Sequence, residues 1–284
     1  GDYGLSPDLP PGRNFDLLGW YLNTPADDDD IGVSDRFSER ELAQGKTDDR
    51  YFFTAEDGGM VFRATIGGAK TSKNTRFTRT ELREMLRRGD TSIGTRNDDK
   101  TPNRNNWVFS SAPKKAQKRA GAVDGTLSAT LAVNRVTSTG DANQVGEVVI
   151  GQIHAARDEP ARLYYRKLPG HERGALYLAH EDARGDDVYY DLLGSRADRN
   201  SDPVDGIPLD EKFSYEIAAH GHDLLVKILV GGQVKAEARV DMSKSGYDVD
   251  KDFMYFKAGA YNKNDTGDPE DFVQLTFYEL SAAH

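Results

Sequence analysis

The stretch VVIGQIHA, residues 148–155, decides how the rest of the sequence is interpreted. Its apolar, β-branched first half is typical of a buried strand. Side chains alternate along a strand, so Gln152 and His154 share one face while Ile153 points to the other. Two polar residues alone are explained most simply by exposure to solvent. Whether they belong to a larger polar sheet face depends on the other strands.

The rest of the chain has the same strand-rich pattern. Runs that are apolar or alternate in polarity lie between turn-rich pieces such as LPGHERG and NKNDTGDPED. We expect strands over residues 60–66, 125–136, 147–155, 162–168, 175–180, 188–193, 212–219, 223–230, 233–240, 253–261 and 271–280. Many short strands joined by such turns predict an all-β sandwich of two antiparallel sheets.

Composition narrows the class of protein. The 284 residues are 37% hydrophobic and 30% charged, and no linker divides them, so we expect one domain over residues 1–284. No cysteine is present, which excludes disulfides and thiolate metal sites. No apolar run approaches the roughly 20 residues that cross a bilayer, and the first residues lack the apolar core of a signal peptide. We expect a soluble protein with no membrane partner.

The chain is acidic. Lys and Arg number 37 against 47 Asp and Glu, a net charge of −10. Such a protein repels nucleic acid unless its positive charges gather locally, so we expect no nucleic-acid partner. Any polyanionic ligand requires a local group of cations.

Two further segments can contribute to a polar sheet face. In TRTELREMLRRGD, residues 78–90, the composition and the spacing of the apolar residues favour a helix. As a strand, the same segment sets three charged side chains on one face: Arg79, Glu81 and Arg83. In FMYFKAGAYNKN, residues 253–264, one strand face carries Tyr255, Lys257, Gly259 and Tyr261. The small Gly259 is expected to let a ligand approach the backbone.

Metal sites have weak support. The run ADDDDIG, residues 26–32, lacks the glycine and distal glutamate of an EF-hand loop and is interpreted as a solvated acidic loop. His220 and His222 flank Gly221 without a third ligand nearby, which favours a hairpin turn over a metal site. The long basic segment 95–121, centred on Trp107, is expected to run over the surface and cover one end of the polar face.

Three segments carry a resemblance to a known family. RTELR at 79–83, QIH at 152–154 and YFKAGAYN at 255–262 resemble, in order, the signature segments of the alginate lyases of polysaccharide lyase family 7. The resemblance implies a β-jelly roll with a concave sheet as substrate cleft, and therefore a strand at 79–83. One residue departs from the family pattern, because Lys263 stands where the family usually has glutamine.

The resemblance also implies the activity. An alginate lyase cleaves the 1,4-glycosidic bonds of alginate by β-elimination and leaves 4,5-unsaturated uronate ends. It needs no cofactor or metal, and we expect a secreted or periplasmic monomer whose partners are alginate and its oligosaccharides. Ile153 in QIH implies acceptance of guluronate-containing substrate.

Residue roles follow by the same resemblance. Arg79 and Gln152 bind the carboxylate of the reacting sugar, and His154 is the base for guluronate. Tyr261 is the acid for the leaving oxygen and also the base for mannuronate, with Lys257 expected to lower its pKa. Glu81 orients an arginine. The residues implied to contact substrate are Glu81, Arg83, Tyr255, Lys257, Asn262 and Lys263.

Two other functions fit the same fold. A glycoside hydrolase needs a pair of carboxylates, and no strand carries two at same-face spacing. A non-catalytic carbohydrate-binding module or lectin would share the polar sheet, but it would not need His154 and Tyr261 together with Arg79.

Overall fold

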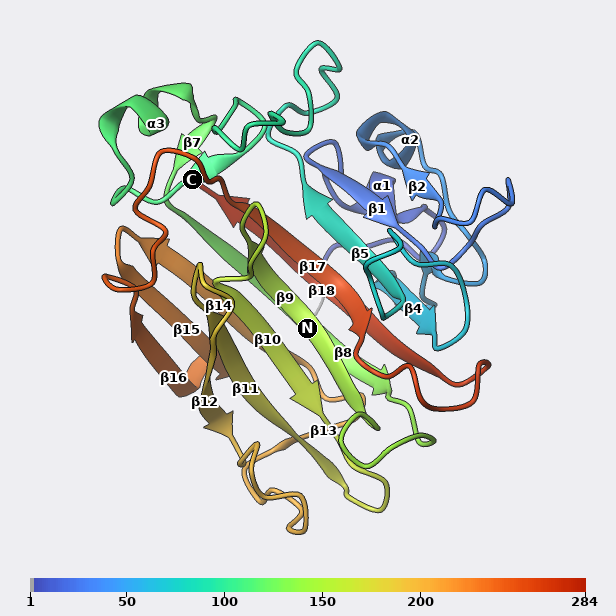
Figure 1. Ribbon diagram of the computed structural model, residues 1–284. Coiled ribbons are helices and arrows are strands. Elements are labelled where there is room, and N and C mark those ends of the chain that lie inside the picture. The colour runs from blue at the N-terminus through green and yellow to red at the C-terminus, as the bar shows by residue number, and fades with distance from the viewer. Residues whose placement is uncertain (1–2) are drawn as a thin grey trace.

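Two large antiparallel sheets build the protein in the computed structural model, which describes residues 3–284 (Figure 1). One has nine strands and the other has seven. In spatial order the nine-stranded sheet contains β12 (Asp187–Leu193), β11 (Arg173–Glu181), β10 (Ala161–Arg166), β9 (Glu147–His154), β17 (Tyr255–Asn262), β5 (Arg79–Glu84), β1 (Trp20–Asn23) and β2 (Arg36–Phe37), with β13 (Ile207–Pro208) beside β11.

The seven-stranded sheet contains, in spatial order, β16 (Gln233–Asp241), β15 (Asp223–Val230), β14 (Phe213–His220), β8 (Gly125–Arg135), β18 (Phe272–Ala283), β4 (Met60–Thr65) and β3 (Phe52–Thr54). The remaining elements are short: β6 (Trp107–Val108), β7 (Ala122–Val123), α1 (Pro11–Asn14), α2 (Glu39–Ala43) and α3 (Lys114–Arg119). A capping box between Ser38 and Glu41 begins α2. No helix within residues 3–284 has the length and apolar character needed to cross a membrane.

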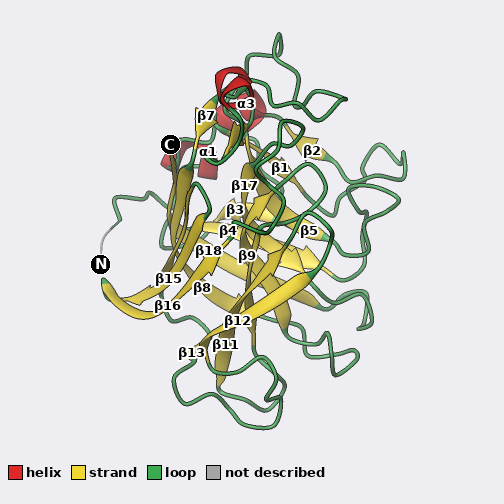
Figure 2. Ribbon diagram, turned by 60° about the vertical axis from the view of Figure 1, so that its left-hand side comes forward, coloured by secondary structure: helices red, strands yellow, loops and turns green. Residues whose placement is uncertain are grey.

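The two sheets pack face to face around the main hydrophobic core (Figure 2). Leu82, Ile153 and Phe256 enter this core from the nine-stranded sheet. Phe62 and Phe277 enter it from the other sheet, with ring centroids 5.0 Å apart. The predicted all-β jelly-roll sandwich is therefore confirmed.

The predicted strands are present, with ends that differ by three residues or fewer. Residues 79–84 form strand β5, as the resemblance implied and against the helical composition of this segment. The reason is tertiary, because β5 pairs with β1 on one side and β17 on the other. His220 ends β14 and His222 lies in the turn before β15, so the predicted hairpin turn is confirmed.

The segment 95–121 is anchored to the core at Trp107, which is fully buried. Its indole Nε1 donates to Glu84 Oε1 at 3.0 Å. His284 Nε2 lies 2.6 Å from Glu84 Oε2, and its ring is 5.3 Å from the Trp107 ring. Burial alone would lower the pKa of His284, but the Glu84 carboxylate outweighs burial and raises it.

This pair predicts a pH-dependent contribution to stability. His284→Gln should lower the free energy of unfolding by about 1.5–3 kcal/mol at pH 6, since a buried charged hydrogen bond is lost. The pKa of His284 is raised in the folded state, so its contribution is complete below about pH 6.5 and disappears as pH rises through the folded value. Urea unfolding of both proteins at pH 6 and pH 9 measures the difference.

The matched control is His222→Gln, because the side chain of His222 is 41% exposed and lies 3.5 Å from Asp248. This exposed pair should change stability by less than about 0.5 kcal/mol at either pH. An equal loss for His284→Gln at pH 6 and pH 9 would contradict an ionic contribution from His284.

Candidate active site

Three neighbouring strands, β5, β17 and β9, bring the signature segments together. Lys257 on β17 lies opposite Arg83 on β5 and opposite Gln152 on β9. Tyr261 lies opposite Arg79 in the same way. The alternate residues of these strands enter the core, so these side chains lie on the opposite side, which we call the polar face.

A buried carboxylate links the three strands. Glu81 Oε1 accepts a hydrogen bond from Arg79 Nη1 and lies close to Lys257 Nζ, each at 2.9 Å. Glu81 Oε2 accepts from Gln152 Nε2 at 2.8 Å. These four residues, called the Glu81 cluster below, are at most 9% exposed.

The Glu81 cluster carries a net positive charge. Burial alone would raise the pKa of Glu81, but Lys257 and Arg79 outweigh it and lower the pKa, so the carboxylate stays ionised. Two cations and one carboxylate leave one positive charge. Glu81 is 0% exposed, and its hydrogen bonds hold Arg79 and Gln152 in place.

Two polar atoms of the Glu81 cluster are buried without a hydrogen-bond partner among residues 3–284: Arg79 Nε and Gln152 Oε1. Gln152 uses one amide N–H on Glu81 and retains the second. Buried polar groups are normally paired, so unpaired ones on the polar face mark where a ligand can supply partners. A guanidinium and an amide suit a carboxylate ligand.

His154 lies one step along the polar face, opposite Tyr255, and their rings stack with centroids 4.9 Å apart. Its Nδ1 is hydrogen-bonded to Ala155 O, and a carbonyl can only accept, so Nδ1 carries the proton of the neutral ring. Burial, with Lys257 and Arg79 nearby, lowers the pKa of His154 to about 3. At neutral pH, Nε2 therefore has a free lone pair.

Tyr261 lies beside three cationic or aromatic groups. The Arg79 guanidinium carbon is 3.8 Å from its ring centroid, Lys263 Nζ is 5.1 Å away, and the Phe77 ring is 6.1 Å away. Burial raises the pKa of Tyr261 more than Arg79 lowers it. Lys257 is not among the groups that act most strongly on this pKa, so the expected net lowering is not found, and the phenol is protonated at neutral pH.

Lys263, the departure from the family pattern, stands at this end of the polar face. Its Nζ lies 4.4 Å from the Phe77 ring. Burial and the Arg162 charge lower the pKa of Lys263 to about 8.

The Arg83 guanidinium is hydrogen-bonded to other groups of the protein. It is 4% exposed, its Nη1 donates to Glu84 O at 2.7 Å, and its Nη2 donates to Asn106 Oδ1 at 3.1 Å and Thr95 O at 3.4 Å. Its guanidinium carbon also lies 3.8 Å from the ring centroid of Tyr255. Arg83 thus fastens the segment 95–121 to the polar face and holds Tyr255 in place.

Asn262 does not reach the polar face. It is 0% exposed and its Nδ2 donates at 3.2 Å to Ala64 O, in the other sheet. The implied substrate contact is therefore wrong for this side chain, because the alternation of β17 turns it between the sheets.

Gly259 also has a different role from the one expected. Its φ is +141°, and a Cβ there would lie 2.7 Å from Thr80 O and 2.9 Å from Glu81 Cα. Glycine at this position permits the close approach of β17 to β5, and it does not open space for a ligand.

Several other side chains lie on or beside the polar face and are not predicted from the sequence. Tyr21 lies opposite Arg83 on β1, a strand too short to show an alternating pattern. Burial alone would raise its pKa, but Arg83, Lys257 and Arg36 outweigh it and lower the pKa. Beside Tyr261 lies an aromatic cluster that includes Phe77, Tyr164, Tyr177 and Tyr189. Part of this cluster is predictable, because the same-face spacing of Arg162, Tyr164 and Arg166 indicates either an extension of the polar face or an exposed strand.

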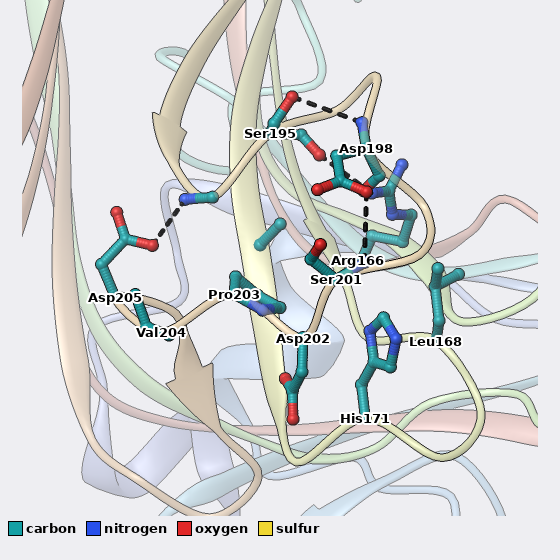
Figure 3. A pocket seen from close by; sticks show the side chains of 12 residues that line it. Arg166, Leu168, His171, Ser195, Asp198, Ser201, Asp202, Pro203, Val204 and Asp205 are labelled. Carbon is teal, nitrogen blue, oxygen red and sulfur yellow. Dashed lines mark hydrogen bonds between the residues drawn. The ribbon is translucent and has the colours of Figure 1, made fainter.

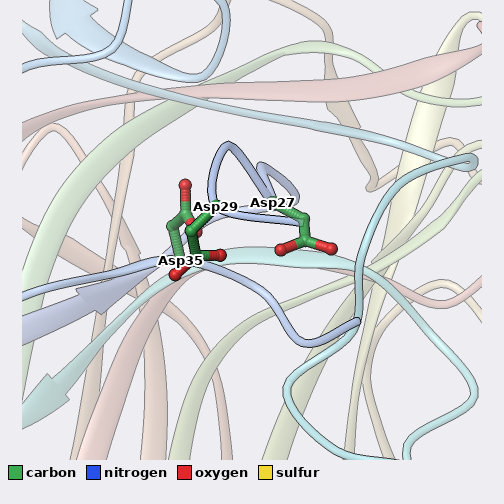
Figure 4. A group of neighbouring side chains, drawn as sticks. All are labelled: Asp27, Asp29 and Asp35. Carbon is green, nitrogen blue, oxygen red and sulfur yellow. The ribbon is translucent and has the colours of Figure 1, made fainter. Parts of the chain in front are cut away.

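Two further features include none of the predicted site residues. Figure 3 shows a cavity of about 380 Å³ lined by Arg166, His171, Asp198 and Asp202, and none of the predicted site residues lines it. Figure 4 shows Asp27, Asp29 and Asp35, whose carboxylate oxygens lie within 4.8 Å of one another. This group includes two residues of the predicted acidic loop, and nothing beyond the carboxylates points to a bound cation.

Comparison with known proteins supports one interpretation of this geometry. The sequence model of a family described as alginate lyase matches residues 15–284. A curated alginate lyase from Klebsiella pneumoniae is 52% identical over 283 residues, covering 96% of this chain and 91% of that protein. The crystal structure of the alginate lyase from this organism superposes with a TM-score of 0.93 at 51% identity, covering 97% of this chain and 98% of that one.

More distant structures share the fold. An alginate lyase from Pseudomonas aeruginosa has a TM-score of 0.68 at 25% identity, covering 95% of this chain and 100% of that chain. A family 7 alginate lyase solved in complex with a product written GGG has a TM-score of 0.69 at 22% identity, covering 97% and 99%.

The jelly roll, the cationic polar face and these relatives together define a polysaccharide lyase. The family match spans most of the chain, and the Klebsiella pneumoniae relative is more than half identical over nearly its full length. The chain therefore belongs to the alginate lyase family. Its activity is the cleavage of alginate.

The Glu81 cluster predicts a large cost for removing its carboxylate. Glu81→Gln leaves the cations of Arg79 and Lys257 buried beside each other, so the free energy of unfolding should fall by about 3–5 kcal/mol. The exposed Arg88–Asp16 pair, at 51% and 68% side-chain exposure, supplies the control Asp16→Asn, which should change stability by less than about 1 kcal/mol. Urea unfolding compares the two variants, and similar small losses would show that Glu81 does not neutralise the buried cations.

Proposed function

We propose that this alginate lyase cleaves guluronate-containing alginate with Arg79 and Gln152 on the substrate carboxylate, His154 as base and Tyr261 as acid. The observation that carries the proposal is the pair of unpartnered buried atoms, Arg79 Nε and Gln152 Oε1, in a net-positive cluster beside a neutral imidazole. A sugar hydroxyl can donate a hydrogen bond to Gln152 Oε1.

Alginate is a chain of uronates, and β-elimination removes the proton on C5 and expels the oxygen on C4. The difficulty is charge, because the carbanion develops beside a carboxylate that is already negative. Arg79 and the free N–H of Gln152 bind that carboxylate and stabilise the charge that grows in the transition state. Because its hydrogen bond to Glu81 already holds Arg79 in position, the site needs little reorganisation when the transition state forms.

The proton transfers are divided between two side chains. His154 Nε2 has a free lone pair and takes the C5 proton of guluronate, whose electrons form the C4–C5 double bond. The C4–O bond breaks, and its oxygen takes the proton of the Tyr261 hydroxyl, which is protonated at neutral pH. Mannuronate is the C5 epimer, so its proton leaves from the opposite side. Tyr261 serves as its base in the phenolate form and returns the same proton to the C4 oxygen, and the raised pKa of Tyr261 favours this reaction at alkaline pH.

The other residues predicted to contact substrate are expected to act in different ways. Lys257 and Lys263 supply positive charge on the polar face, and Tyr255 offers a ring that is partly exposed. Arg83 acts through Tyr255 and the segment 95–121. We expect a monomer that acts outside the cytoplasm, secreted or periplasmic, because a long polymer is cut where it is deposited.

Tyr261→Phe tests the function directly. Incubation of the wild-type protein with alginate should produce the ultraviolet absorbance of an unsaturated uronate, whereas Tyr261→Phe should lower kcat by at least about 100-fold, because the acid is lost. Binding of alginate oligosaccharide, measured by calorimetry, should be largely kept. A carbohydrate-binding module would bind but give no absorbance with either protein. A normal rate in Tyr261→Phe would remove Tyr261 from the reaction.

His154→Ala tests the division between the two uronates. Cleavage of poly-guluronate should fall by about 100-fold or more, because its base is removed, while poly-mannuronate cleavage should fall by less. Initial rates on the two purified block types measure the ratio. The control is His180→Gln, because the His180 ring is hydrogen-bonded to Pro160 O and Ser245 Oγ, away from the polar face. This substitution should change the two rates by the same factor. An equal loss on both blocks in His154→Ala would mean that His154 serves the carboxylate common to both sugars.

A further inference from the structure

A second carboxylate stands beside the base and has no role in the mechanism above. Glu159 belongs to the turn between β9 and β10, five residues after His154. Its Oε1 lies 3.7 Å from His154 Nε2, the nitrogen with the free lone pair. At this distance no hydrogen bond joins them, which agrees with a neutral imidazole in the free protein.

The free imidazole alone is a weak base. Burial, Lys257 and Arg79 oppose its positive form, outweigh the Ala155 carbonyl and the Glu81 carboxylate that favour it, and lower the pKa of His154 to about 3. A base is most effective when its pKa lies near the working pH. The imidazolium formed during the reaction therefore needs a nearby negative charge, and bound substrate can neutralise only Arg79 and Lys257. Among residues 3–284, the carboxylate that forms an ion-pair contact within 4 Å of the His154 ring is that of Glu159.

Glu159 also lies beside a second carboxyl, that of Glu181. Its backbone N–H donates to Glu181 Oε1 at 2.9 Å, and its Oε2 lies 3.4 Å from Arg162 Nη1. Burial and the Glu159 carboxyl raise the pKa of Glu181 to about 7. The side chains of Glu159 and Glu181 are 23% and 16% exposed, so the pair has contact with solvent.

Several elements contribute groups that face this carboxylate. The charged and titratable groups with electrostatic contact to Glu159 are His154, Arg162, Glu181, Tyr247, Tyr255, Tyr261 and Lys263. Arg162 also pairs with Asp187 at 2.9 Å, so its charge is divided among several acids. Arg162 is therefore shared among Glu159, Glu181 and Asp187.

We propose that Glu159 is a positioning residue for His154. The Glu159 carboxylate stabilises the imidazolium that forms when His154 abstracts the C5 proton, and the Glu159–Glu181 pair then passes that proton to solvent. This inference rests on the proposed function, in which His154 is the base for guluronate. The proton moves from C5 to Nε2, then to a Glu159 oxygen, and then to water. The Tyr261 phenolate recovers its proton from water, so the enzyme returns to its starting state without a net change in protons.

The test is the pH profile of Glu159→Gln on poly-guluronate, measured from about pH 5.5 to 8.5 by ultraviolet absorbance. Wild-type kcat should rise as pH increases through about 7, where the pKa of Glu181 lies and this carboxyl beside Glu159 loses its proton. Glu159→Gln should lower kcat about tenfold or more, with KM changed less than about twofold, and should remove this rise. Glu159→Asp, which keeps the carboxylate, should restore part of kcat and the rise.

Two comparisons separate this role from a structural one. Asp187→Asn removes another carboxylate bound to Arg162 but should keep the rise near pH 7, since Asp187 has no contact with His154. Glu159→Gln should reduce poly-mannuronate cleavage much less than poly-guluronate cleavage, because Tyr261 is the base there. Equal losses on both polymers, or a wild-type kcat and profile in Glu159→Gln, would overturn the inference.

The outcomes also distinguish this inference from the function on which it rests. If His154→Ala cleaves poly-guluronate normally, or the wild-type protein does not cleave it, the proposed base and substrate fail and the role of Glu159 fails with them. If His154→Ala loses this activity while Glu159→Gln retains it, the role of Glu159 alone is wrong.

Discussion

The carboxylate of Glu81 has to stay ionised inside the protein, and that requirement shapes the polar face around it. An isolated buried charge is strongly unfavourable, so Arg79, Lys257 and Gln152 must surround it. These partners come from three strands that are far apart in the chain. A slip of one residue in any strand would turn its partner into the core, so the charge requirement also specifies strand register.

The same cluster resolves an apparent conflict in charge. The chain has a net charge of −10, yet its substrate is a polyanion. The interaction of exposed charges is screened over about 10 Å in salt solution, whereas buried charges at short distance are screened much less. Arg79 and Lys257 therefore determine the potential at the polar face, and acidic groups elsewhere on the surface matter little there.

Alternation of side chains was sufficient to predict the long strands and to place Gln152 and His154 together. It failed where neighbouring strands impose other constraints. The composition of residues 79–84 favours a helix, but pairing on both sides makes them a strand. The resemblance suggested a ligand contact for Asn262, which lies between the sheets, and Tyr21 belongs to a strand of four residues without a readable pattern. The pKa of Tyr261 depends on burial, which local sequence does not reveal.

The hydrogen bonds of Arg83 hold the base of the segment 95–121 and leave its tip free to vary. Arg83 and Asn106 secure the base of the segment 95–121 through Thr95 O. Residues 96–99 beyond this anchor are exposed, and the turn is closed by a bond from Lys100 N to Asn97 O. Insertions at this tip would leave the anchor intact, because long surface loops add little closure entropy. Evolution or engineering can therefore lengthen this tip while the catalytic groups keep their geometry.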